Sequence, residues 1–156
     1  MAGKYRPPSA DEPSFERPPR PLGVPIMCTT NIILAGTVPL IRTFFQSQGN
    51  FFLLPAVTRL VGVALPILIL WASWSTWSGR DRGRTALLYL LTIYYAIQIF
   101  SYVIILQTGI LDSTTTLVTI LSILFAIAWV GFNWWYFLRP ATLIYYRRPK
   151  KSPPSN

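Results

Sequence analysis

The residues of this sequence best suited to chemistry are polar side chains inside long apolar runs. Asn31 falls near the middle of the first run, Gln98 near the middle of the third, and Arg59 is the charge within the second. Hydrocarbon penalises a polar group that lacks a partner, so such residues mark helix contacts, ligand cavities or ion pathways. We therefore predict that the amides of Asn31 and Gln98 meet at the middle of the bilayer and hydrogen bond to each other.

A polar stripe follows the third apolar run. Tyr94, Gln98, Ser101 and Tyr102 recur at steps of three and four residues, which places them on one face of a helix. A stripe of this kind joins helices through hydrogen bonds or lines a polar ligand cavity. The sequence favours the first interpretation and leaves the second as the alternative.

Arg59 also has two interpretations. It lies toward the outer end of the second run, where its long side chain can extend to the lipid headgroups. Alternatively, it pairs with Asp112, the carboxylate expected on the same side of the membrane. The second interpretation would create a specific charged site at the outer surface.

Few residues can support catalysis or metal binding. The chain has no histidine and one cysteine, which leaves no imidazole or paired-thiolate metal site and no disulfide within one chain. Its carboxylates lie outside the apolar runs, at Asp11, Glu12, Glu16, Asp81 and Asp112. Proton-coupled transport relies on acids or histidines within the membrane, and general acid–base catalysis would depend on tyrosine or arginine alone. We therefore expect no enzyme activity, no metal and no cofactor.

The elements that carry these residues are four apolar stretches, at 23–41, 53–74, 85–108 and 117–138. Each has about 19 residues or more, enough to cross a hydrocarbon layer of about 30 Å. In composition, 52% of the chain is hydrophobic and 12% is charged, which indicates lipid rather than water as the solvent. Because the connections are short, neighbouring helices must run antiparallel. We predict an all-α integral membrane protein with a four-helix transmembrane bundle over residues 23–138.

Basic residues are distributed unevenly about these stretches. Four lie in the N-terminal tail, three in the second loop and five after the fourth stretch, against Arg42 and Arg59 on the other side. Loops rich in Lys and Arg stay on the cytoplasmic side. We therefore predict that both termini and the central loop are cytoplasmic. The formal charge of +9 then indicates contact with anionic lipid headgroups rather than with nucleic acid.

Two tails flank the predicted bundle. Residues 1–22 are rich in proline and charge and poor in aliphatic side chains, which predicts a disordered or extended segment. Residues 139–156 are predicted to form a basic tail, in which residues 141–146 lie along the headgroups as a short amphipathic turn.

Aromatic residues mark the cytoplasmic border of the predicted bundle. The expected interface anchors are Trp71, Trp74 and Trp77 in the second helix and Trp134, Trp135 and Arg139 at the end of the fourth. Such residues sit at headgroup level, and an aromatic platform for a pigment or quinone is the alternative. Within the helices, Pro39 and Pro66 are expected to cause bends, and Gly36 and Gly62 to permit close helix approach.

The two ends of the predicted bundle carry a family resemblance. RPLGVPIMCTTNIILAG covers residues 20–36 and WWYFLRPATLIYYRR covers residues 134–148. Both resemble a loose group of small uncharacterised bacterial and archaeal four-helix membrane proteins, which begin with an RPLGV-like segment and end with a YLxRPxVxxYF-like one. In this chain Leu143 stands where the group tends to have Val. The resemblance implies the four-helix topology and carries no known activity or site residues.

These observations favour a non-enzymatic accessory, scaffolding or assembly subunit that packs beside a larger membrane complex or forms a homo-oligomer. The alternative is a binding or carrier protein for a small hydrophobic molecule such as a lipid, quinone or pigment, held between the helices by Asn31, Gln98 and the tyrosines. A membrane enzyme that uses Arg and Tyr on a lipid headgroup ranks third. We expect a multi-pass protein of the bacterial inner membrane, with an internal photosynthetic or organellar membrane as the alternative.

Overall fold

The computed structural model describes residues 19–47, 60–109 and 111–146, and within these ranges the chain forms helices and turns with no strand. Three of the described helices are long and apolar enough to cross a membrane: Gly23–Phe45, Asp81–Gln107 and Ser113–Leu138. A fourth apolar helix, Val61–Trp77, is shorter. The structure therefore confirms a helical protein with membrane-length apolar helices, while residues 53–59 of the second predicted stretch lie outside the described residues.

The elements follow one another as nearly continuous helices. In chain order they are α1 (Gly23–Asn31), η1 (Ile32–Thr37), α2 (Val38–Ser47), η3 (Leu60–Ala64), α4 (Leu65–Trp77), α5 (Asp81–Gln107), α6 (Ser113–Leu138) and α7 (Pro140–Tyr146). Thus α1, η1 and α2 form one helix, and η3 with α4 forms another. The helices α5 and α6 begin about four residues before the apolar runs that predicted them, because polar residues in a first helical turn still reach water.

The elements η1 and η3 are π-helical, and each ends just before a proline-containing turn. Pro39 and Pro66 have no amide hydrogen, and a proline ring in a regular α-helix clashes with the carbonyl four residues earlier. A wider turn relieves that clash while the helix continues. The prolines thus change the hydrogen-bond pattern of the first two helices without ending them.

Two glycines bring these helices close together. A Cβ atom at Gly36 in η1 would collide with the Leu70 side chain of α4, and one at Gly62 in η3 would collide with Thr43 of α2. The prediction that both glycines permit close approach is confirmed.

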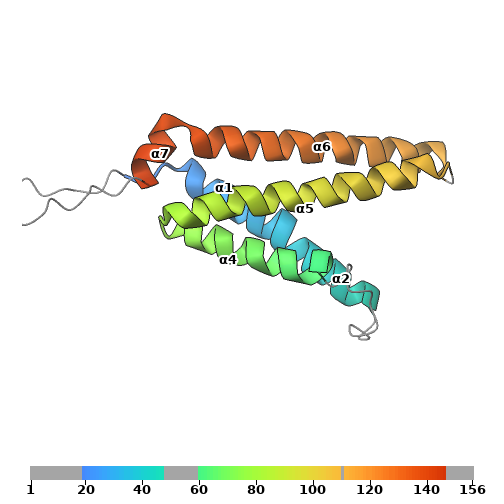
Figure 1. Cartoon of the computed structure of the whole chain (residues 1–156), viewed down its shortest axis with the longest axis horizontal. Coiled ribbons are helices and arrows are strands. Elements are labelled where there is room, and N and C mark those ends of the chain that lie inside the picture. Colours follow the sequence, from blue (N-terminus) through green and yellow to red (C-terminus); the bar gives the residue numbers. More distant parts are fainter. Residues whose placement is uncertain (1–18, 48–59, 110, 147–156) are drawn as a thin grey trace, which may run out of the picture.

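Helices that follow one another in the chain also pack against one another. The helix α4 packs against α1, η1 and α5, and α5 also packs along α6 (Figure 1). We call the end of the bundle with the start of α1, the α4–α5 turn and α7 the α7 end. The opposite end, where α2 ends and α5 turns into α6, is the α2 end. Figure 1 shows that α2 diverges from α5 and α6 toward the α2 end.

Buried side chains gather toward the α7 end. The fully buried ones include Val24, Ile69, Leu87, Leu91 and Phe137. In α5, every fully buried residue precedes position 96, and the later residues are half-buried or exposed. The bundle is therefore tightly packed at one end and loosely packed at the other.

Candidate functional site

A buried amide cluster links the first and last long helices. Asn31 is fully buried, and its Nδ2 donates a hydrogen bond of 2.7 Å to Oδ1 of Asn133 in α6. The indole Nε1 of Trp129 donates to Oδ1 of Asn31 at 3.0 Å, and Nδ2 of Asn133 donates to the Trp129 carbonyl at 2.9 Å. The buried amides of Asn31 and Asn133 are therefore hydrogen bonded to protein groups.

The prediction that Asn31 and Gln98 hydrogen bond to each other is wrong. The Nε2 atom of Gln98 donates instead to the Tyr94 hydroxyl at 3.0 Å, within α5. The reason is that the two residues lie at different depths along the bundle. Asn31 lies roughly eight residues from the α7 end of its helix and Gln98 roughly seventeen, which separates them by about 13 Å along the bundle at 1.5 Å per residue.

Sequence reasoning missed two residues of this region. Asn133 is a polar residue in an apolar run and meets the same criterion that singled out Asn31. Thr92 gives no such signal, because threonine hydroxyls in helices usually bond to their own backbone, as Thr92 does to Leu88. In the structure Thr92 also accepts a hydrogen bond of 2.9 Å from Nε1 of Trp134.

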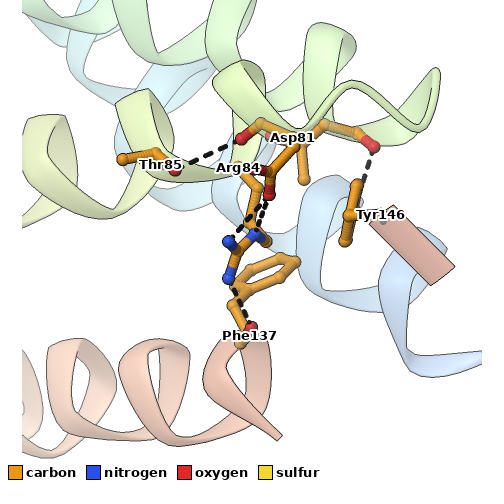
Figure 2. A network of polar contacts seen from close by, with 6 residues as sticks. Asp81, Arg84, Thr85, Phe137 and Tyr146 are labelled. Atoms are coloured by element: carbon orange, nitrogen blue, oxygen red, sulfur yellow. Dashed lines mark hydrogen bonds and ion pairs between the residues drawn. The ribbon is translucent and has the colours of Figure 1, made fainter. Parts of the chain in front are cut away.

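A second polar cluster closes the α7 end of the bundle (Figure 2). Arg84 in the first turn of α5 donates from Nε to Asp81 at 2.8 Å and from Nη1 to the Phe137 carbonyl at 2.9 Å. Its guanidinium carbon lies 5.6 Å from the centre of the Tyr146 ring. The Phe137 carbonyl is in the last turn of α6, where it has no partner within its own helix. Arg84 thus supplies, from α5, the hydrogen-bond donor that the Phe137 carbonyl of α6 needs.

The short helix α7 folds back onto this cluster. The hydroxyl of Tyr146 donates to the Thr76 carbonyl of α4 at 3.0 Å, and Arg20 donates from Nε to the Tyr145 hydroxyl at 3.2 Å. Burial raises the pKa of Tyr146 above its usual range. Thr142 and Tyr146 are buried against the bundle, while Ile144 is exposed, and the position of this segment along the headgroups stays a prediction. Residues 140–146 are a docked helix rather than part of a tail.

The predicted interface anchors lie on the outside of the bundle. Trp71, Trp74 and Trp135 are exposed, whereas Trp77 and Trp134 are half-buried. The Arg139 guanidinium lies 3.4 Å from the centre of the Trp135 ring, a cation–π contact. Their role at a membrane interface stays a prediction.

A cavity of about 750 Å³ lies between the helices toward the α2 end. Its walls come from η1 with α2, from η3, from α5 and from α6. All four residues of the predicted polar stripe, Tyr94, Gln98, Ser101 and Tyr102, line it. The volume falls in the range of about 300–1,000 Å³ that is typical of ligand pockets. The stripe therefore faces a cavity, which is the alternative that the sequence left open.

Some of the polar groups in the cavity wall are already bonded within their own helices. The hydroxyl of Ser101 donates to the Ile97 carbonyl at 2.9 Å, and that of Ser122 donates to the Val118 carbonyl at 2.8 Å. Gln98 uses one of its amide hydrogens on Tyr94. Among the described residues, the Tyr102 hydroxyl and the Arg42 guanidinium have no protein hydrogen-bond partner, so both can bind a ligand.

Arg59 lies outside the described residues, so its pairing with Asp112 stays a prediction. Asp112 itself is exposed and occupies the N-cap position of α6. A hydrogen bond from the Thr115 side chain lowers the pKa of the Asp112 carboxyl below its usual range. An ionised carboxylate at this position is favoured by the helix dipole.

No family model matches the chain, and neither a curated protein nor a solved structure matches it. The resemblance of the two ends to small four-helix proteins therefore stays a prediction. The part of the chain that the structure describes contains no group of three His, Cys, Asp or Glu side chains able to hold a metal ion. The cavity at the α2 end is the candidate functional site.

Proposed function

We propose that this chain is a four-span membrane protein that binds a small hydrophobic or amphiphilic molecule in the cavity at the α2 end. The observation that carries the proposal is that the polar stripe of α5 faces a ligand-sized cavity instead of a neighbouring helix. A packed bundle would bury such a stripe against a partner helix. We therefore prefer the binding or carrier function, which the sequence left as the alternative, over the accessory-subunit function.

The fourth span in this proposal is the helix made of η3 and α4. Its described part, residues 60–77, measures about 27 Å at 1.5 Å per residue, close to the thickness of the hydrocarbon layer of about 30 Å. It lies beside α5 and is joined to it by a short turn at the α7 end. The positive-inside rule then places the α7 end, and with it both termini, on the cytoplasmic side.

Thiol labelling tests this topology. In a Cys28→Ala background, Ser78→Cys marks the α4–α5 turn and Ser113→Cys marks the α5–α6 turn, and both positions are exposed. We expect an impermeant maleimide added to intact cells to label Ser113→Cys at once and Ser78→Cys only after the cells are opened. Labelling of both variants from the same side would end the four-span model.

Native mass spectrometry tests the binding proposal. The full chain, purified in a mild non-ionic detergent, should retain a hydrophobic molecule in stoichiometric amount. Leu121→Trp adds bulk to a cavity-lining residue of α6, whereas Leu124→Trp adds the same bulk to an exposed residue outside the lining. We expect Leu121→Trp to lose the bound molecule and Leu124→Trp to keep it. Equal retention by both variants, or no bound molecule in the unmodified chain, would contradict the proposal.

An accessory or assembly subunit, or a homo-oligomer, remains the second candidate, and the surface of α6 favours it. Buried residues of this helix are confined to Thr119, Ala126, Asn133 and Phe137, so most of α6 faces outward. The outward side chains are large and apolar, and either lipid or a partner helix can cover them. The same mass spectra distinguish the two functions, because an accessory subunit would retain a protein partner, or a second copy of itself, instead of a small molecule.

A further inference from the structure

We propose that the ligand of this cavity is an acyl chain with an anionic headgroup, a carboxylate or a phosphate, bound by Arg42. The inference rests on the proposed binding function and names the class of ligand. It follows from the chemical character of the cavity wall, which combines hydrogen-bond donors with apolar side chains.

The polar part of the wall can donate hydrogen bonds but carries no negative charge. Arg42 contributes a guanidinium with five N–H donors, and Tyr102 contributes a hydroxyl. Gln98 has one amide hydrogen left after its bond to Tyr94. No Asp or Glu is among the described residues that line the cavity. An oxyanion is the ligand group that accepts from such donors without leaving a charge uncompensated.

Arg42 is the source of charge selectivity. It is exposed, lies in α2 toward the α2 end, and forms no ion pair with any described residue. The Arg84 side chain, by contrast, already has a carboxylate and a carbonyl as partners. Guanidinium binds carboxylate and phosphate through two parallel hydrogen bonds. Arg42 is therefore an available cation at the wall of a cavity large enough for a ligand.

The remaining wall suits an acyl chain. The wall also contains five apolar side chains: Leu34 and Val38 of the first helix, Val61 of η3, and Leu121 and Phe125 of α6. These side chains are aliphatic or aromatic and form no hydrogen bonds. A ligand with its oxyanion on Arg42 and its chain among these residues would satisfy both parts of the wall.

The experiment compares ligands that differ only in the headgroup. The full chain is placed in nanodiscs of phosphatidylcholine, and the binding of oleate, oleyl alcohol and an oleoyl lysophosphatidic acid is measured by competition with a fluorescent fatty acid. We expect both anions to bind about tenfold or more tightly than the alcohol, since hydrogen bonds to charged groups exceed neutral ones by about that factor. Arg42→Gln should remove this preference, while the control Arg82→Gln, an exposed arginine at the α7 end, should leave it unchanged.

The outcomes separate this inference from the function on which it rests. Equal binding of oleate and oleyl alcohol, unaffected by Arg42→Gln but abolished by Leu121→Trp, would overturn the anionic class and leave the binding function intact. Binding of all three ligands that survives Leu121→Trp would overturn both. A preference between the two anions identifies the source of the ligand. Stronger binding of oleate indicates a free fatty acid, and stronger binding of the lysophosphatidic acid indicates a membrane lipid. Either result supports the inference.

Discussion

The two ends of the same bundle are held together in different ways. At the α7 end, Arg84 and Tyr146 donate hydrogen bonds to backbone carbonyls of α6 and α4, and Asn31 is paired with Asn133. At the α2 end, polar side chains face a cavity, and some bond only within their own helix. Lipid solvates apolar side chains as well as a protein interior does, so apolar burial alone gives helices little reason to associate. We infer that hydrogen bonds between helices decide which end of the bundle is closed.

Arg84→Met should give the largest loss of stability, because it removes the donor that satisfies the end of α6. The side chain of Arg84 is 11% exposed and that of Asp81 is 57% exposed, so solvent screens the ion pair and the bond to the Phe137 carbonyl matters more. We expect the free energy of unfolding to fall by about 1.5–3 kcal/mol, the range for hydrogen bonds to charged groups. Unfolding by sodium dodecyl sulfate, followed by circular dichroism, measures it. Arg82→Met is the control, and an equal loss there would contradict the role of Arg84.

Asn31→Leu and Asn133→Leu should each lower the free energy of unfolding by about 0.6–2 kcal/mol, as other side-chain hydrogen bonds in membranes do. Because the two amides share one hydrogen bond, the double variant should lose less than the sum of the single losses. Gln98→Leu combined with Asn31→Leu should be additive, since these residues do not meet. Additivity between Asn31 and Asn133 would show that the amide cluster does not join α1 to α6.

Tyr146→Phe should lower the free energy of unfolding by about 0.5–1.5 kcal/mol, the usual contribution of one hydrogen bond. Burial raises the pKa of Tyr146 in the folded chain above its ordinary value of 10.0. The stabilisation is therefore complete below about pH 10 and is lost as the pH rises above it, since the unfolded chain releases the proton first. Stability measured from pH 8 to 11 should fall less steeply for Tyr146→Phe. Parallel curves would show that α7 does not dock through this tyrosine.

Tyr102→Phe and Ser101→Ala should give the smallest effects at the α2 end, within about 0.5 kcal/mol, because neither side chain bonds to another helix in the described part of the chain. The same unfolding assay measures both losses. Thr92→Val serves as the contrast, because Thr92 lies in α5 as well but accepts a hydrogen bond from Trp134 of α6. A loss of more than about 1 kcal/mol for Tyr102→Phe would mean that the polar stripe holds helices together.

The sequence by itself determined the features that depend on local pattern. The apolar runs predicted the helices, since length and hydropathy are properties of each segment alone. The steps of three and four residues placed Tyr94, Gln98, Ser101 and Tyr102 on one face, and all four do line one cavity. The glycine contacts were also predicted correctly, because a residue without a side chain is where two backbones can approach.

The tertiary structure alone decided which residues meet. Asn31 could pair with any amide on a facing helix, and only the relative depth and rotation of the helices selected Asn133 over Gln98. Arg84 is one of the three basic residues that the sequence places in the second loop. The packing of α5 against α6 brings it to the Phe137 carbonyl. The cavity lies toward the α2 end, where α2 diverges from α6. The sequence could not predict it, because periodicity within one helix carries no information about the distance to another helix.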